Sequence, residues 1–131
     1  MIPSRKKFAG WDILWKKRKE VLRMAAISVN TEQFSQMLAG EKPLLADFWA
    51  PWCVHCRRLQ AAFDQVAREN EDSVLAVKIN IDEEGKLANS QKIEVIPTLA
   101  LYQGGKRMAS IVNPGSKAEI DGFLREALGG R

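Results

Sequence analysis

Two cysteines separated by two residues, Cys53 and Cys56, are the side chains of this sequence best suited to chemistry. They follow an apolar stretch, residues 44–50, at the point where a helical pattern begins. Backbone N–H groups at a helix start lack partners within the helix and carry partial positive charge, so they favour a thiolate at the first cysteine. The second cysteine lies one turn further on, where it can attack a mixed disulfide. The spacing therefore predicts thiol–disulfide exchange.

A zinc half-site and a pair of inert thiols are the alternatives to a redox pair. Zinc normally takes four ligands, and the sequence holds no third cysteine and only one histidine, His55. We therefore expect neither a metal site nor a bound cofactor. A strand followed by this motif and a helix favours the redox interpretation.

Asp47 interrupts the apolar stretch that precedes the cysteines. A nearly continuous apolar strand is normally covered on both faces of its sheet. A carboxyl group in such a strand loses hydration, which raises its pKa and lets it exchange a proton near neutral pH. A role in proton transfer with Cys56 and a plain aspartate at a locally solvated position are the two interpretations.

Strands alternate with helices along residues 26–131. We expect strands over residues 27–29, 44–50, 74–81, 98–102 and 106–112. We expect helices from the capping sequence at residues 30–33 to Gly40, over about 53–70, over 83–92 and over 116–128. Gly104 and Gly105 signal a hairpin between the last two strands. This order predicts an α/β fold with a mixed sheet covered on both faces.

The composition is that of one globular domain, with 131 residues, 46% hydrophobic and 27% charged. Its net charge of +4 is unevenly spread, because residues 1–23 carry +6 and the remainder −2. The basic total is therefore no argument for nucleic-acid binding by the domain. No secretory signal is visible and two cysteines are too few for a secreted disulfide framework, so we expect a cytoplasmic protein.

Residues 1–25 form a basic extension ahead of the domain at 26–131. Its apolar residues between positions 11 and 22 allow an amphipathic helix that binds a membrane surface or a partner. An unstructured basic tail is the second interpretation. The third is an untranslated leader, because codons for Lys19, Glu20 and Val21 can form a ribosome-binding sequence shortly before Met24. Peptides from residues 5–20 of the native protein would contradict this third interpretation.

Three separated segments resemble the thioredoxin family in order and spacing: ADFWAPWCVHC at residues 46–56, KINID at 78–82 and VIPT at 95–98. The resemblance covers about residues 27–128. It implies a thioredoxin fold, with three α/β/α layers around a central mixed sheet of four to five strands. It also implies that Cys53 attacks a substrate disulfide and that Cys56, assisted by Asp47, resolves the mixed disulfide.

The resemblance assigns roles to five further residues. Lys78 is similar to the family's lysine partner of the buried aspartate, and an ordinary strand lysine that reaches solvent is the alternative. Pro97 is similar to the family's cis-proline, whose loop, with Ile96, lies beside the cysteines and binds substrate backbone. Trp52 flanks the site as an exposed apolar contact or as a partly buried packing residue. Asn113 stands where a glycine usually lets the substrate backbone approach, which bears on substrate range.

Three other positions depart from the family's pattern. Val54 and His55 replace the common Gly-Pro between the cysteines, and a histidine there is similar to disulfide isomerases and periplasmic oxidases. A partly positive imidazole stabilises the reduced form, so we expect a reduction potential between about −270 and about −180 mV. A solvent-facing histidine with little effect is the alternative. Ala61 replaces a helix-kinking proline, which predicts a straighter helix.

These observations predict a protein-disulfide reductase that serves electron transport and cell redox homeostasis. We expect a monomer that acts on disulfide-containing proteins and is recharged by a thioredoxin-reductase-type enzyme. One alternative is a disulfide oxidase or isomerase that uses the same residues in the other direction. Another is a thioredoxin-fold binding module whose cysteines only regulate it.

Overall fold

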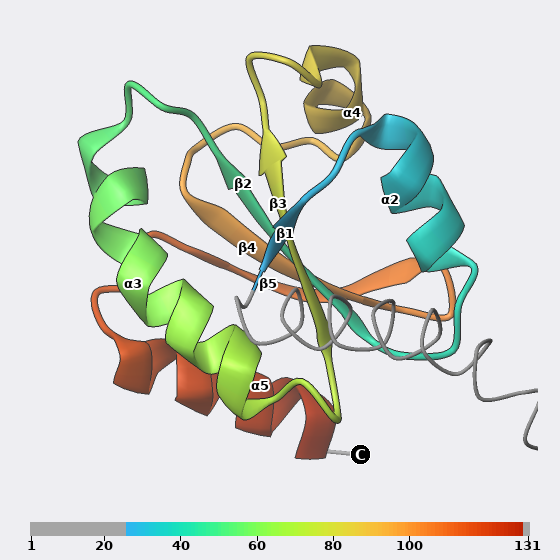
Figure 1. Cartoon of the computed structure of the whole chain (residues 1–131), viewed down its shortest axis with the longest axis vertical. Coiled ribbons are helices and arrows are strands. Elements are labelled where there is room, and N and C mark those ends of the chain that lie inside the picture. The colour runs from blue at the N-terminus through green and yellow to red at the C-terminus, as the bar shows by residue number, and fades with distance from the viewer. Residues whose placement is uncertain (1–25, 130–131) are drawn as a thin grey trace, which may run out of the picture.

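A central sheet lies between two layers of helices in the computed structural model, which describes residues 26–129 (Figure 1). The strands are β1 (Ile27–Ser28), β2 (Leu44–Trp49), β3 (Leu75–Asn80), β4 (Thr98–Gln103) and β5 (Lys106–Val112). The helices are α2 (Thr31–Leu38), α3 (Val54–Glu69), α4 (Gly85–Ser90) and α5 (Lys117–Gly129). The predicted alternation of strands and helices is confirmed.

The five strands are ordered β1-β3-β2-β4-β5. The first three strands in this order run parallel, whereas β4 pairs antiparallel with β2, and β5 pairs antiparallel with β4. Gly104 and Gly105 make the predicted hairpin turn with φ angles of 64° and 80°, a region that favours glycine. The mixed sheet with an antiparallel edge hairpin is therefore confirmed.

Each face of the sheet has its own apolar core. Helices α3 and α5 cover one face, where Leu59, Phe63 and Ile120 pack against Leu45 and Leu99 of the strands. Helices α2 and α4 cover the opposite face, where Phe34 of α2 and Leu87 of α4 belong to a second buried cluster. Its strand residues are Leu44, Ala46, Phe48, Val77, Ile79, Ala100 and Tyr102. Strand β2 is central and covered on both sides, which places any polar side chain on it in the interior.

The sequence predicts the start of α2 correctly but predicts a longer α4 than the structure has. Asn30 caps α2 through the predicted capping box, in which the N–H of Gln33 donates to Asn30 Oδ1 at 2.8 Å and the N–H of Asn30 donates to Gln33 Oε1 at 2.9 Å. Helix α4 is shorter than predicted, because the N–H groups of Glu83 and Glu84 donate to the carbonyl of Asn80 in a turn. At its other end, Lys92 has a φ of 57° that does not continue a helix.

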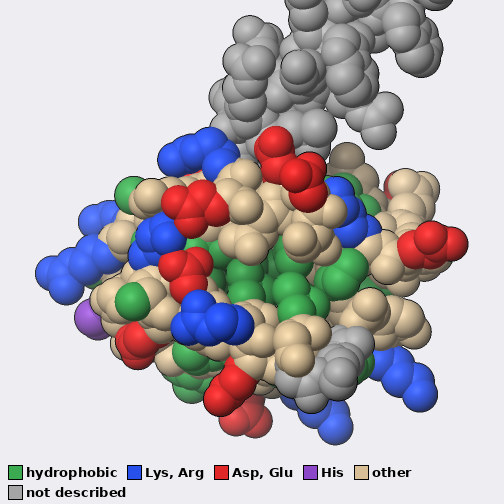
Figure 2. Space-filling model, turned by 90° about the horizontal axis from the view of Figure 1, so that it is seen from below, with side chains coloured by type: hydrophobic (Ala, Val, Ile, Leu, Met, Phe, Trp, Pro, Cys, Tyr) green, Lys and Arg blue, Asp and Glu red, His purple; other side chains and the backbone are tan. Residues whose placement is uncertain are grey.

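One face of the molecule shows how its charges are distributed. Apolar side chains occupy the centre of this face, and Lys, Arg, Asp and Glu side chains surround them (Figure 2). The two signs of charge are mixed there, so this face presents no surface of one sign. None of the helices within residues 26–129 is long and apolar enough to cross a membrane. The predictions made for residues 1–25, including the start at Met24, lie outside the described residues.

Candidate functional site

Cys53 and Cys56 lie at the first turn of α3. Cys53 is the N-cap residue, and its Sγ accepts a hydrogen bond from the backbone N–H of Cys56 at 3.2 Å. Its thiol also lies 4.0 Å from the carbonyl oxygen of Ile96. Both cysteines are free thiols in this structure. A backbone N–H directed at the sulfur, together with the positive end of a sixteen-residue helix, favours negative charge on Cys53.

The two cysteines differ in their surroundings. Cys53 keeps 8% of its surface exposed, whereas Cys56 has none. Burial is the largest of the effects that raise the pKa of Cys56 to about 12, and the hydrogen bond with Cys53 and the nearby carboxylate of Asp47 contribute to the same rise. Cys53 is therefore the sulfur placed to attack first, and Cys56 needs a base before it can act.

Asp47 is such a base candidate, because its side chain is completely buried beneath the cysteine helix. Neither carboxylate oxygen has a hydrogen-bond partner among the described residues. Its pKa is raised to about 7, because the effect of burial and the smaller effect of the negative charge of Asp64 outweigh the positive charge of Lys78, which lowers it. The predicted burial is confirmed and the locally solvated alternative is wrong, whereas proton transfer by Asp47 stays a prediction.

Lys78 is placed differently from what the resemblance implies. It is the register partner of Asp47 on the adjacent parallel strand. However, its ammonium Nζ lies 3.0 Å from Oδ1 of Asp64 on α3, so its ion pair is with that residue. Sequence reasoning missed Asp64. The available signal was an acidic residue at the edge of the buried face of α3, next to Phe63.

The loop before β4 brings Pro97 to the cysteines. The Ile96–Pro97 peptide bond is cis, as the resemblance implies. Ile96 is partly buried against a small cluster that contains Cys53 and Cys56. The carbonyl of Pro97 accepts a hydrogen bond from the N–H of Asn113 at 2.8 Å, which places Asn113 at the same end of the sheet. Asn113 has a φ of 47°, a conformation that glycine adopts most easily.

Exposed apolar side chains lie around the start of α3, where the cysteines are. Trp52 is 64% exposed, so the alternative of a packed tryptophan is wrong for this residue. Its indole Nε1 donates to the carboxylate of Asp82 at 3.1 and 3.2 Å, which orients the ring. Val54 and Val95 are also half exposed or more. An exposed apolar group beside a reactive sulfur is suited to contact a protein substrate.

His55 and Asn113 line the same hollow of about 220 Å³, together with Arg58. The hollow lies between the start of α3 and the loop that leads into α5. His55 itself is exposed. Two of the sequence departures from the family's pattern, His55 and Asn113, therefore lie together at the start of the cysteine helix.

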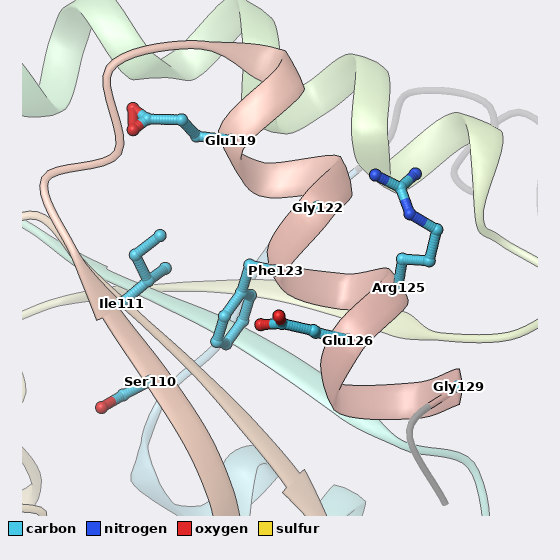
Figure 3. Close-up of a pocket in the computed structure, with 8 residues that line it drawn as sticks. All are labelled: Ser110, Ile111, Glu119, Gly122, Phe123, Arg125, Glu126 and Gly129. Atoms are coloured by element: carbon cyan, nitrogen blue, oxygen red, sulfur yellow. The ribbon is translucent and has the colours of Figure 1, made fainter.

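A wider hollow of about 770 Å³ lies between β5 and α5, away from the cysteines. Phe123 and Ile111 point into it, with Glu126 beside the phenyl ring, while Arg125 points away toward α3 (Figure 3). The hollow contains no thiol. Among residues 26–129 no group of three or more His, Cys, Asp or Glu side chains could hold a metal ion.

Comparison with known proteins gives a consistent result. The family model described as thioredoxin matches residues 25–126. The chloroplastic M-type thioredoxin of Chlamydomonas reinhardtii is 38% identical over 105 residues, which are 79% of this chain and 75% of that protein. Thioredoxin 1 of a Nostoc species is 35% identical over 105 residues, which are 79% and 98% of the two chains. The solved thioredoxin of Malassezia sympodialis superposes with a TM-score of 0.73 at 23% identity and covers 79% of this chain and 90% of that one.

Proposed function

This chain belongs to the thioredoxin family of thiol–disulfide oxidoreductases, and we propose that it acts in the cell as a net reductant of protein disulfides through Cys53 and Cys56. The observation that carries the proposal is the asymmetry of the two thiols. Cys53 accepts an N–H hydrogen bond at the helix start, whereas Cys56 is fully buried. Cys53 is thus placed to attack the substrate first, and Cys56 attacks only in the second step.

The first step is attack of the Cys53 thiolate on one sulfur of a substrate disulfide. The substrate S–S bond breaks, a Cys53–substrate disulfide forms, and the released substrate sulfur takes up a proton. Cys56 then loses its proton and attacks the sulfur of Cys53. The mixed disulfide breaks, the second substrate thiol leaves, and a Cys53–Cys56 disulfide remains. The substrate gains two electrons and two protons, which the dithiol supplies.

Asp47 accepts the proton of Cys56 in the second step. A thiol with a pKa near 12 is almost entirely protonated at neutral pH, so unaided attack would be slow. A carboxyl group with a pKa of about 7 is partly ionised at that pH and is a strong enough base to assist. Its burial keeps competing water from the proton.

The substrate chain lies across the exposed apolar side chains around Cys53. Trp52 provides an aromatic contact, and the segment from Ile96 to Pro97 offers backbone groups beside the reactive sulfur. Asn113 and His55 line the neighbouring hollow, where they contact residues that flank the substrate cysteine. Val54 adds to the same apolar surface.

The oxidised protein returns to its dithiol form through a thioredoxin-reductase-type enzyme. We also propose that the protein works as a monomer and in the cytoplasm, where reducing conditions support a net reductant. Cell fractionation tests the location. The oxidase or isomerase and the binding module are not favoured, since the relatives it matches are thioredoxins.

Two cysteine variants test the mechanism with insulin as a model disulfide substrate. Cys53→Ser should reduce the rate of insulin reduction to background. Cys56→Ser should still attack once and should accumulate a mixed disulfide, visible by mass spectrometry as one protein plus one insulin chain. A Cys53→Ser variant that reduces insulin at the wild-type rate would contradict the proposal.

A further inference from the structure

We propose that Asp64 is a positioning residue for the second step: by holding the ammonium of Lys78, it sets the pH at which Asp47 can take the proton of Cys56. The inference rests on the role proposed above for Asp47. Asp64 itself touches neither cysteine in the proposed reaction. It acts through the lysine and through its own charge.

The geometry places one cation between two carboxyl groups. Lys78 and Asp47 are register partners on β3 and β2. Side chains alternate between sheet faces, and Leu45 and Ala76, two residues before them on each strand, pack in the α3 and α5 core. Asp47 and Lys78 therefore face α3, which carries Asp64. The ammonium lies 3.0 Å from Asp64, and both oxygens of Asp47 are left without a hydrogen bond.

Exposure explains why the ammonium pairs with the outer carboxylate. The side chain of Asp64 is 30% exposed and that of Lys78 is 15% exposed, whereas Asp47 has no exposed surface. Moving the ammonium fully inward would remove its remaining hydration, which is costly for a charged group. Pairing at the edge of the core leaves part of both side chains exposed, although the paired oxygen Oδ1 of Asp64 is itself buried.

Asp64 acts on Asp47 in two ways that have the same sign. Its carboxylate holds the Lys78 ammonium in an ion pair, so the positive charge of Lys78 stabilises ionised Asp47 less. Its own negative charge also disfavours a second negative charge nearby, and this repulsion raises the pKa of Asp47 beyond the larger effect of burial. Removing the charge of Asp64 should therefore let Asp47 ionise at lower pH.

Few other charged or titratable groups face Asp47. The register partner on β4 is Leu99, and the buried residues of α5 are Ile120 and Leu124, all of them apolar. From α3 the titratable groups are the two cysteines and Asp64, and from β3 the charged group is Lys78. Among the described residues, Asp64 and Lys78 are therefore the charged side chains through which this carboxyl group can be tuned.

The test uses the full chain and four variants, one of which is Lys78→Met. Asp64→Asn removes the charge at nearly constant shape, and Asp64→Glu restores it. Glu69→Gln is the matched control, because Glu69 lies on the same helix in an ion pair of 2.8 Å with Lys117. The first measurement is a carboxyl carbon NMR titration of Asp47 in the oxidised protein, where the disulfide removes the thiol titrations. The second is the pH profile of mixed-disulfide resolution in a single turnover.

We expect Asp64→Asn to lower the Asp47 titration midpoint by about one pH unit and to move the kinetic profile by the same amount. Asp64→Glu and Glu69→Gln should stay near wild type. Lys78→Met should move both midpoints upward, which keeps the inference testable if Asp64→Asn folds poorly.

Two results would overturn the inference and differ in their cause. If the titration midpoint of Asp47 is unchanged in Asp64→Asn, the positioning role of Asp64 is wrong, but the proposed function is not affected. If the Asp47 midpoint falls in Asp64→Asn while the pH profile of resolution does not move, Asp47 does not take the proton of Cys56. Both the proposed role of Asp47 and the inference are then wrong.

Discussion

Asp47 and Lys78 occupy paired positions on parallel strands, yet neither carboxylate oxygen of Asp47 has a hydrogen-bond partner among residues 26–129. A buried carboxyl group in this state favours its protonated form. The fold therefore holds a group that costs stability when it ionises. Such a group is useful where a proton must be accepted, because its charge is poorly stabilised.

The pH dependence of stability should show this cost. The folded-state pKa of Asp47 is about 7, above its ordinary value of 3.8, so the folded protein binds this proton more tightly than the unfolded chain. The resulting stabilisation is complete below about pH 4 and is lost as the pH rises to about 7, a change of about 4 kcal/mol.

Asp47→Asn should remove that dependence. We expect its free energy of unfolding to exceed that of the wild type at pH 8 and to vary less between pH 5 and pH 8. Denaturant unfolding of both proteins in the oxidised form measures the difference without thiol titration. Parallel stability curves for the two proteins would contradict the prediction.

Trp52→Ala should weaken the reduction of protein substrates. The indole is 64% exposed and held by Asp82, so it presents a fixed aromatic surface. Loss of an aromatic contact of this kind should raise the KM for insulin by about tenfold. The rate with a small aromatic disulfide, which does not span this surface, should change little. Equal losses with both substrates would instead indicate damage to the cysteines.

Asp82→Asn provides a milder test of the same contact. The tryptophan remains, but its N–H loses a charged acceptor, so the ring is less firmly oriented. We expect the KM for insulin to rise by about threefold. A value of kcat that stays constant while KM rises would place the effect in binding.

Asn30→Ala should lower stability without changing the chemistry. The side chain of Asn30 accepts from the N–H of Gln33, and this cap lies on α2, outside the cysteine site. Its loss should cost about 1 kcal/mol in the free energy of unfolding. Insulin reduction at a temperature well below the transition should match the wild type. A large activity loss would mean that α2 contributes to the site.

Local signals in the sequence predict the positions of the cysteines and the buried aspartate. The apolar run around Asp47 indicates a covered strand, and the change of pattern at Cys53 indicates a helix start; both are confirmed. Gly104 and Gly105 similarly predict the hairpin, because few other residues tolerate such φ angles. Each of these signals lies within a few residues of the feature it predicts.

Local sequence signals of this kind do not predict the ion pair between Asp64 and Lys78. Its partners come from a helix and a strand, and only the packing of α3 over β3 brings them together. The family's pattern makes Lys78 the partner of Asp47. The two are register partners and the charge of Lys78 lowers the pKa of Asp47, whereas the ion pair of Lys78 is with Asp64. By contrast, the hydrogen bond from Asn113 to Pro97 continues the β4–β5 ladder one residue beyond the pair of Thr98 and Val112, so it follows from the predicted hairpin pairing.

His55→Ala tests how far the histidine controls the reduction potential of the Cys53–Cys56 pair. A positive imidazole near Cys53 favours the reduced form, so its removal should shift the potential toward more negative values. His55 is exposed beside a hollow, and solvent weakens its field. We therefore expect a shift of at most about 30 mV. Equilibration of both proteins in a glutathione redox buffer measures this shift.

A wild-type reduction potential near that of thioredoxin, about −270 mV, together with no shift in the variant, would mean that solvent screens His55. A wild-type value near about −180 mV, together with a shift well beyond 30 mV, would mean that His55 controls the site, and the role as a net reductant would then be wrong.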